Sequence, residues 1–190
     1  MLRWASAKRI GKFPLQTCGE WFISDTRFGP MVHARLGIAE ENSGKLVTLV
    51  RREAKTLAES KNIDLILTDG APGVGCPVIA SIGGADAVLV VTEPTVSGVH
   101  DMERVIQLAD FFKTRAVVCV NKYDLNQEKA REVEDFAIQK GVAFLGRIPF
   151  DPIFTKAMVQ GRNIFEYDPG SEACRAVGQI WEKIKNKIIS

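Results

Sequence analysis

A glycine-rich loop after an aliphatic run is the strongest chemical signal in the sequence. Asp69 follows the run IDLILT, and Gly70, Pro72, Gly73 and Gly75 come soon after it. A carboxylate in this position can hold Mg²⁺ or one of its water ligands, and a glycine amide can approach a terminal phosphate because no Cβ stands in the way. The pattern favours a loop that senses the phosphates of a nucleotide. An ordinary strand-to-helix turn capped by Asp69 is the alternative.

A second polar group, VNKYDL, also ends an aliphatic run. The side-chain amide of Asn121 carries both a donor and an acceptor, so it can read the edge of a purine, while the stem of Lys122 can lie against the ring. The same letters also begin helices that bind nothing. The motif alone does not separate these two interpretations.

Two further polar turns are expected to cap helices. In TEPTVSG, Glu93 and Thr95 could border a site, but a helix cap at Thr95 or Ser97 is the favoured interpretation. In IPFD, Asp151 is expected to cap a helix, and a backbone contact to a bound base is the functional alternative.

The cysteines give no sign of a metal site or a disulfide scaffold. Cys18, Cys76, Cys119 and Cys174 lie far apart and form no C-x-x-C pair, which favours a reducing cytoplasm. Cys76 lies in the glycine-rich loop. A small residue packed under the next helix is favoured there over a reactive thiolate or a ligand of a cluster shared between subunits.

Composition sets limits on the partners of this chain of 190 residues. A hydrophobic content of 46% is enough for a substantial core, and the net charge of +2 is too small to indicate a nucleic-acid surface. No apolar run approaches the length needed to span a bilayer. We therefore expect a cytoplasmic protein without a membrane span.

Strands and helices alternate after the first forty residues. Unbroken aliphatic runs predict buried strands, and amphipathic spacing predicts helices. The predicted strands are 63–68, 87–92, 116–120 and 143–148, and the predicted helices are 43–61, 97–113, 127–140, 152–160 and 172–188. This order predicts an α/β fold with an open, mostly parallel sheet and helices on both faces, in which ligands bind beyond the carboxyl ends of the strands.

The N-terminal part is less regular. Residues 1–20 are basic and are expected to be poorly ordered or left over from a longer chain, although an amphipathic presequence is conceivable. The aromatic segment 21–30, WFISDTRFGP, fits either a cover for a neighbouring module or a strand and turn.

Taken in order, LILTDGAPGVGCPVIAS, VVTEPTVSGVHDMERV, VNKYDL and GRIPFD resemble the later motifs of the MinD/ParA superfamily of deviant-Walker ATPases. The subgroup with an inserted ferredoxin domain is the most similar, and the resemblance runs from about Trp21 to the end. It implies that residues 21–190 are the C-terminal part of a P-loop NTPase-like domain, incomplete at the N-terminus.

The resemblance also implies roles for individual residues. Asp69 is the catalytic candidate and reaches Mg²⁺ through water, Gly73 contacts the γ-phosphate, and Asn121 reads the adenine edge. The residues implied in nucleotide binding are Pro72, Gly73, Asn121, Lys122, Pro149, Phe150 and Asp151. The partners implied are an adenine nucleotide and a redox or iron–sulfur protein, and a homodimer is possible.

The phosphate loop G-x-x-x-x-G-K-[S/T] is absent from the sequence. Gly11-Lys12 is followed by Phe13, and Gly44-Lys45 by Leu46, so neither pair fits. The ferredoxin cysteine runs are absent as well. ATP, Mg²⁺ and iron–sulfur clusters are therefore expected in the complete protein, while this chain alone is expected to bind none of them and to be inactive.

Three alternatives remain open. NKYDL also resembles the guanine-reading motif of GTPases, with Asp124 facing the base, but their Asp-x-x-Gly switch would need glycine where Pro72 stands. A non-catalytic interaction module would keep the fold and bind no nucleotide. An ATP-dependent amide synthase of the cobyrinate type shares the nucleotide fold.

Overall fold

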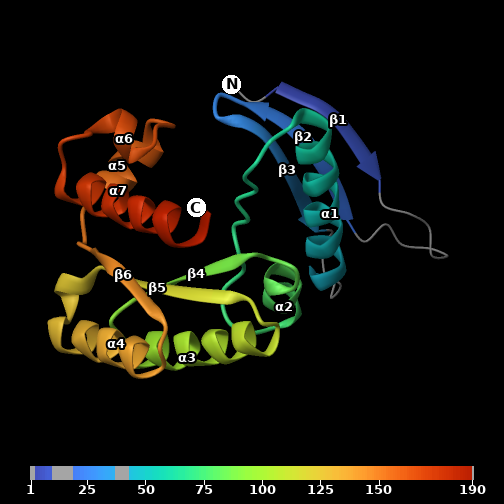
Figure 1. The fold of residues 1–190 in the computed structure, drawn as a ribbon. Helices are drawn as coiled ribbons and strands as arrows, with labels where there is room; N and C mark the ends of the chain where they lie inside the picture. Colours follow the sequence, from blue (N-terminus) through green and yellow to red (C-terminus); the bar gives the residue numbers. More distant parts are fainter. Residues whose placement is uncertain (1–2, 10–18, 37–42, 190) are drawn as a thin grey trace. The chain divides into compact units, whose positions relative to one another are not determined.

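The computed structural model describes residues 3–9, 19–36 and 43–189. The chain divides into two compact units, the first ending at Gly83 and the second beginning at Gly84. Each unit is described by itself below, and both are drawn in Figure 1. No helix among the described residues is long and apolar enough to cross a membrane.

The first unit contains an antiparallel sheet that the sequence did not predict. Its strands, in spatial order, are β1 (Arg3–Arg9), β2 (Gly19–Thr26) and β3 (Gly29–Leu36). The turn between β2 and β3 is held by the Thr26 hydroxyl, which donates to the Gly29 carbonyl at 2.7 Å and accepts from the Phe28 amide at 3.1 Å. The strand-and-turn interpretation of residues 21–30 is confirmed, whereas β1 falls in a segment where no element was expected.

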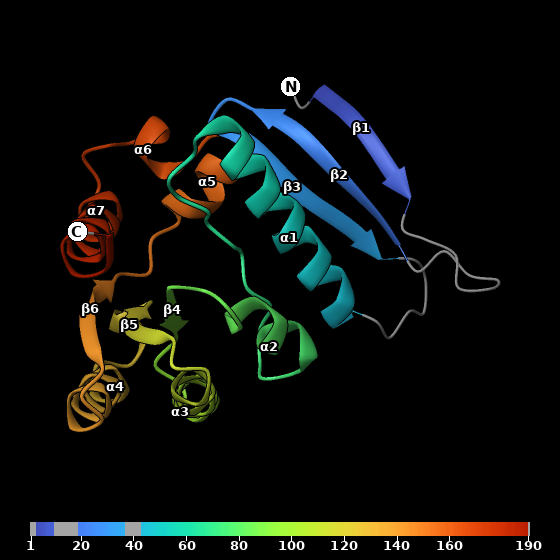
Figure 2. The ribbon, with the colours of Figure 1, turned by 45° about the vertical axis from the view of Figure 1, so that its right-hand side comes forward.

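Two helices complete the first unit. Helix α1 (Ser43–Lys61) has the predicted bounds and lies against the antiparallel sheet in both Figure 1 and Figure 2. Arg51 on α1 donates to the carbonyl oxygens of Ala80 and Gly83 at the end of α2 (Cys76–Ile82). Because the last carbonyls of a helix lack intrahelical partners, this guanidinium joins the two helices.

The predicted strand at 63–68 is not formed. Neither sheet among the described residues includes it, and Leu65, Ile66 and Leu67 are exposed, Leu67 to 88%. An aliphatic run becomes a strand only where a neighbouring strand completes its backbone hydrogen bonds and other elements cover its side chains. The prediction that a buried strand delivers Asp69 to the edge of the parallel sheet is therefore wrong for this structure.

The second unit is built on the predicted parallel sheet. Its strands, in spatial order, are β4 (Ala87–Thr92), β5 (Arg115–Asn121) and β6 (Ala143–Ile148). In Figures 1 and 2, α3 (Val96–Phe111) and α4 (Gln127–Gln139) lie along one face, and α7 (Glu172–Ile184) lies along the other. The prediction of an α/β fold with helices on both faces is confirmed.

Alternation along β5 fills both cores of the second unit. Val118 and Val120 pack among the side chains of α3 and α4, whereas Val117 and Cys119 pack against Ile180 of α7. These four residues of β5 are essentially inaccessible to solvent. Since successive side chains of a strand point to opposite faces, an unbroken aliphatic run is what a doubly covered strand requires.

Short helices complete the second unit. The 3-10 turn η1 (Tyr123–Leu125) follows β5, α5 (Ile153–Val159) and α6 (Ile164–Tyr167) follow β6, and a π-helical turn η2 (Lys185–Ile189) ends the chain. Helix α6, which the sequence did not predict, begins with a capping box. Asn163 and Glu166 each accept a hydrogen bond from the other's backbone amide, at 2.8 and 2.9 Å.

Candidate functional site

Three loops meet at one edge of the parallel sheet. Because β4, β5 and β6 run in the same direction, the loops that follow them start side by side, with Thr92 opposite Val120 and Asn121 opposite Ile148. These loops begin at Glu93, at Lys122 and at Pro149. They carry four of the eight residues that the sequence predicted for the site, and a fifth, Asn121, ends β5.

An ion pair joins the first two loops. Lys122 Nζ lies 2.6 Å from Glu93 Oε1. Lys122 adopts a left-handed backbone conformation, with φ of 55°. The side chains are 36% and 46% exposed, so the pair adds only about 0–1 kcal/mol to stability. Its effect is to fix where the lysine stem lies.

A carboxylate joins the second loop to the third. Asp124 Oδ1 accepts a hydrogen bond from the Phe150 backbone amide at 2.7 Å. A hydrogen bond to an ionised acceptor is stronger than one between neutral groups. The NKYDL loop therefore holds both of its neighbours, one through Lys122 and the other through Asp124.

The Glu93 loop is compact because of one glycine. Thr95 Oγ1 accepts from the Gly98 amide at 3.0 Å and Thr92 Oγ1 donates to the Gly98 carbonyl at 2.9 Å. A Cβ at Gly98 would lie 2.4 Å from the Glu93 carbonyl oxygen, which no relaxed structure tolerates. The predicted cap at Thr95 is confirmed.

The third loop presents backbone and an aromatic ring. Asp151 Oδ1 accepts from the Ile153 amide at 2.9 Å, so its side chain meets the first amide of α5, while the N-cap residue of that helix is Pro152 and not Asp151. The Phe150 side chain is 52% exposed. Asn121, at the end of β5, is half-buried. The groups left to meet a ligand are thus the Asn121 amide, the Lys122 stem and the Pro149–Phe150 backbone.

The Asp69 loop belongs to the first unit and is described separately. Asp69 and Pro72 are exposed, and Gly73 has a φ of +80°. A Cβ on Gly73 would meet nothing within 4 Å, so conformation and not crowding selects glycine there. The loop passes through Gly75 directly into α2, which begins at Cys76.

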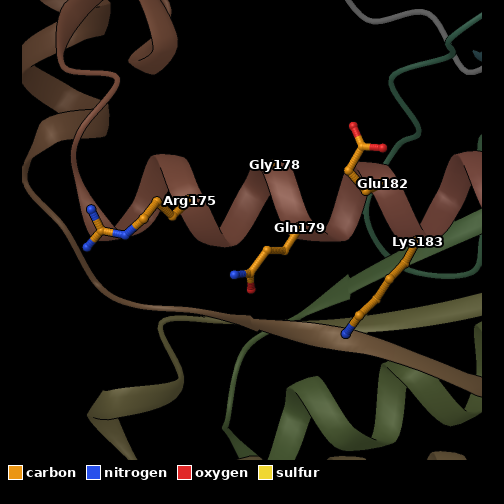
Figure 3. A pocket seen from close by; sticks show the side chains of 5 residues that line it. All are labelled: Arg175, Gly178, Gln179, Glu182 and Lys183. Carbon is orange, nitrogen blue, oxygen red and sulfur yellow. The ribbon is translucent and has the colours of Figure 1, made fainter.

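A different hollow lies along α7 of the second unit. It has a volume of about 480 Å³ and is lined by Arg175, Gly178, Gln179, Glu182 and Lys183. In Figure 3, Gln179 and Lys183 point towards the strand below the helix and Glu182 points away from it. Lys183 Nζ donates to the Leu145 carbonyl at 2.6 Å and Glu182 pairs with Lys185 at 2.7 Å. Lys183 and Glu182 therefore already serve the fold, and no motif in the sequence singled them out.

The cysteines divide into one exposed thiol and two buried ones, while Cys18 lies outside the described residues. Burial raises the pKa of Cys119 to about 11, and burial together with Asp168 raises the pKa of Cys174. Cys76 is exposed. Among the residues that the structure describes, no three His, Cys, Asp or Glu side chains are grouped so that they could hold a metal ion.

The chain has clear relatives among curated proteins, although it matches no protein-family model. It is 29% identical over 159 residues to an uncharacterized protein of Methanocaldococcus jannaschii, covering 84% of this chain and 52% of that protein. It is 29% identical over 133 residues to the antiactivator FleN of Pseudomonas aeruginosa, covering 66% of this chain and 48% of FleN. It is 26% identical over 159 residues to an iron-sulfur cluster carrier protein of Pyrococcus horikoshii, covering 76% and 53%. The chain spans about half the length of these relatives.

A solved structure shares the fold. The MinD cell division protein of Aquifex aeolicus superposes with a TM-score of 0.65 at 23% sequence identity, over 87% of this chain and 69% of that one. At this identity the superposition establishes the fold alone.

Proposed function

Because this chain belongs to the MinD/ParA superfamily by its ordered motifs, its relatives and its fold, we propose that it is the switch and base-binding portion of a MinD-like ATPase. In this proposal residues 21–190 are the C-terminal part of a P-loop NTPase-like domain, and a phosphate loop outside this sequence completes the site. The observation that carries it is the Asp124–Phe150 hydrogen bond, which ties the two loops that would enclose a base.

The residues proposed to bind the base all belong to the second unit. The Asn121 side chain offers one donor and one acceptor, which match the amino group and the neighbouring ring nitrogen of adenine. The Lys122 stem, fixed by Glu93, would lie against the ring face. Pro149, Phe150 and Asp151 would form the opposite wall through their backbone.

The Asp69 loop, which belongs to the first unit, is proposed by itself as a phosphate-sensing loop. The positive φ of Gly73 suits a loop whose amide approaches a terminal phosphate. Asp69 is a single exposed carboxylate, which fits a water-mediated contact to Mg²⁺, an ion that keeps several of its waters. Mg²⁺, when bound, would neutralise charge on the transferred phosphoryl group.

The proposed role of hydrolysis is to switch an iron–sulfur partner. Similarity to an iron-sulfur cluster carrier protein and to a cytosolic Fe-S cluster assembly factor of Bos taurus supports this part of the proposal. In the complete form, ATP binding and hydrolysis would be coupled to an inserted ferredoxin domain or to a separate redox protein, in a homodimer. A module that binds no nucleotide is the rival.

We predict that this chain alone shows no ATPase activity above background. The phosphate-loop lysine and amides supply most of the stabilisation of the transferred phosphoryl group, and no residue of this sequence replaces them. Phosphate release should be measured with and without Mg²⁺, and in Asp69→Ala as a control for contaminating enzymes. Steady turnover that disappears in Asp69→Ala would contradict the prediction.

In the complete protein, ATP should bind more tightly than GTP. Guanine has a ring N–H where adenine has an acceptor nitrogen, so it does not match the Asn121 amide and hydrogen bonds are lost. This loss should weaken binding by about 1–3 kcal/mol, or roughly 5- to 150-fold in affinity. Equilibrium binding of both nucleotides to wild type and Asp124→Ala tests this function. Tighter GTP binding that collapses in Asp124→Ala would support the GTPase instead.

A further inference from the structure

Asp124 occupies the position that, in the guanine-reading motif, would face the base. In this structure its carboxylate instead accepts the Phe150 backbone amide at 2.7 Å. We propose that Asp124 is a positioning residue, which fixes the 149–151 loop against the NKYDL loop and does not itself read the base. The inference deepens the proposed function and rests on it for the identity of the ligand.

The local geometry favours a fixed contact. Pro149 has no N–H, so the Phe150 amide is the first backbone donor after β6. The next loop carboxylate, Asp151, is already engaged with the Ile153 amide. Asp124 thus meets the first backbone amide of this loop. Both partners are in the second unit, so the contact belongs to a single compact body.

The NKYDL loop is itself held in place. Lys122 turns the chain in a left-handed conformation directly after β5 and pairs with Glu93 at 2.6 Å. The 3-10 turn that follows, Tyr123–Leu125, carries Asp124. A carboxylate on a short turn anchored by a strand is a stable reference point for the neighbouring loop.

This role has a consequence for base choice. To read guanine, a carboxylate accepts from two neighbouring N–H groups with its two oxygens. Here Oδ1 already accepts from the Phe150 amide, so a guanine read in this way would have to share that oxygen with the 149–151 loop. Adenine makes no such demand, because its edge suits the Asn121 amide. In this proposal the Asp124–Phe150 hydrogen bond acts on the 149–151 loop and does not contact the base.

Two variants at one position separate positioning from base reading. Asp124→Asn keeps an acceptor oxygen and should retain the bond to Phe150, whereas Asp124→Ala removes it. Asp135→Ala, an exposed carboxylate on α4, is the matched control. Amide hydrogen exchange of Phe150, followed by NMR in this 190-residue chain, is the direct readout and needs no nucleotide.

We expect the Phe150 amide to exchange about tenfold faster or more in Asp124→Ala, and within a few-fold of wild type in Asp124→Asn and Asp135→Ala. An unchanged rate in Asp124→Ala would overturn the inference, even if nucleotides bind as proposed.

Nucleotide binding to the complete protein is the second test of the positioning role of Asp124. Asp124→Ala should weaken ATP binding about five- to tenfold, and Asp124→Asn should restore it. Equal loss of affinity in both variants would mean that the carboxylate reads the base, and would overturn the positioning role. If neither wild type nor the variants bind nucleotide, but the Phe150 amide still exchanges faster in Asp124→Ala, the positioning role of Asp124 is supported and the proposed function fails.

Discussion

Gly98→Ala lowers the stability of the second unit by about 1–3 kcal/mol, the usual cost of forcing an extra methyl group into a packed structure. The added Cβ would lie 2.4 Å from the Glu93 carbonyl oxygen and 2.9 Å from Thr92 Oγ1. The first of these atoms is backbone, so the start of α3 and the Glu93 loop must move apart. The loss should be read from urea unfolding followed by circular dichroism.

Gly178→Ala is the matched control for this experiment. Gly178 also lies inside a helix of the second unit, but a Cβ there would meet only Phe165 Cε1 at 3.9 Å, an ordinary contact. Alanine should therefore stabilise α7 by about 0.5–1 kcal/mol, because glycine loses more conformational entropy in a helix. If both variants have the same stability, the close contact at Gly98 does not exist in solution.

Cys76 is expected to react with iodoacetamide at pH 8 at least about a hundred times faster than Cys119, because only the thiolate is a nucleophile. Cys119 is 1% exposed, and burial raises its pKa to about 11, which leaves about one molecule in a thousand as thiolate at pH 8. Cys76 is exposed at the first position of α2. Peptide mass spectrometry at timed intervals reports each thiol separately.

The sign of the pH dependence gives a second check on the same thiols. Since burial raises the pKa of Cys119, its labelling rate should increase about tenfold per pH unit from pH 8 until the pH approaches 11. The same raised pKa means that ionisation of this thiol opposes folding only above its unfolded pKa of about 9. In urea all cysteines should react at similar rates. Comparable rates in the native chain would show that β5 is not buried as described.

The elements that the sequence predicted well are those with local causes. The strand at 87–92 has the predicted bounds and comes from an unbroken aliphatic run, and the strand at 143–148 has the predicted bounds and ends just before Pro149. The cap at Thr95 and the contact of Asp151 with the start of α5 follow from side chains that reach backbone amides two or three residues away.

The elements that the sequence missed depend on distant partners. The run at 63–68 has the composition of a strand, but a strand also needs a neighbour, and none of the described strands pairs with it. The antiparallel sheet was missed for the reverse reason. Its strand β1 is a basic segment whose pairing with β2 supplies the order that its composition does not indicate.

In the candidate site, too, the features with local causes were predictable and those that depend on distant partners were not. The motif VNKYDL correctly indicated a loop at the edge of the parallel sheet, because it follows an aliphatic run directly. The contacts that give this loop its role, Glu93–Lys122 and Asp124–Phe150, join residues 29 and 26 positions apart in the sequence. Spacing alone could not select these partners, since each depends on how neighbouring strands are ordered in the sheet.

The exposed run at 63–68 also bears on how the protein behaves at high concentration. It holds five uncharged residues of high aliphatic content around a single charge, Asp64, and contains no proline. Segments of this kind are the usual seeds of intermolecular β-pairing and aggregation when they lack a partner within their own chain. A lysine in this run, for instance Leu67→Lys at the most exposed of its aliphatic residues, should reduce aggregation.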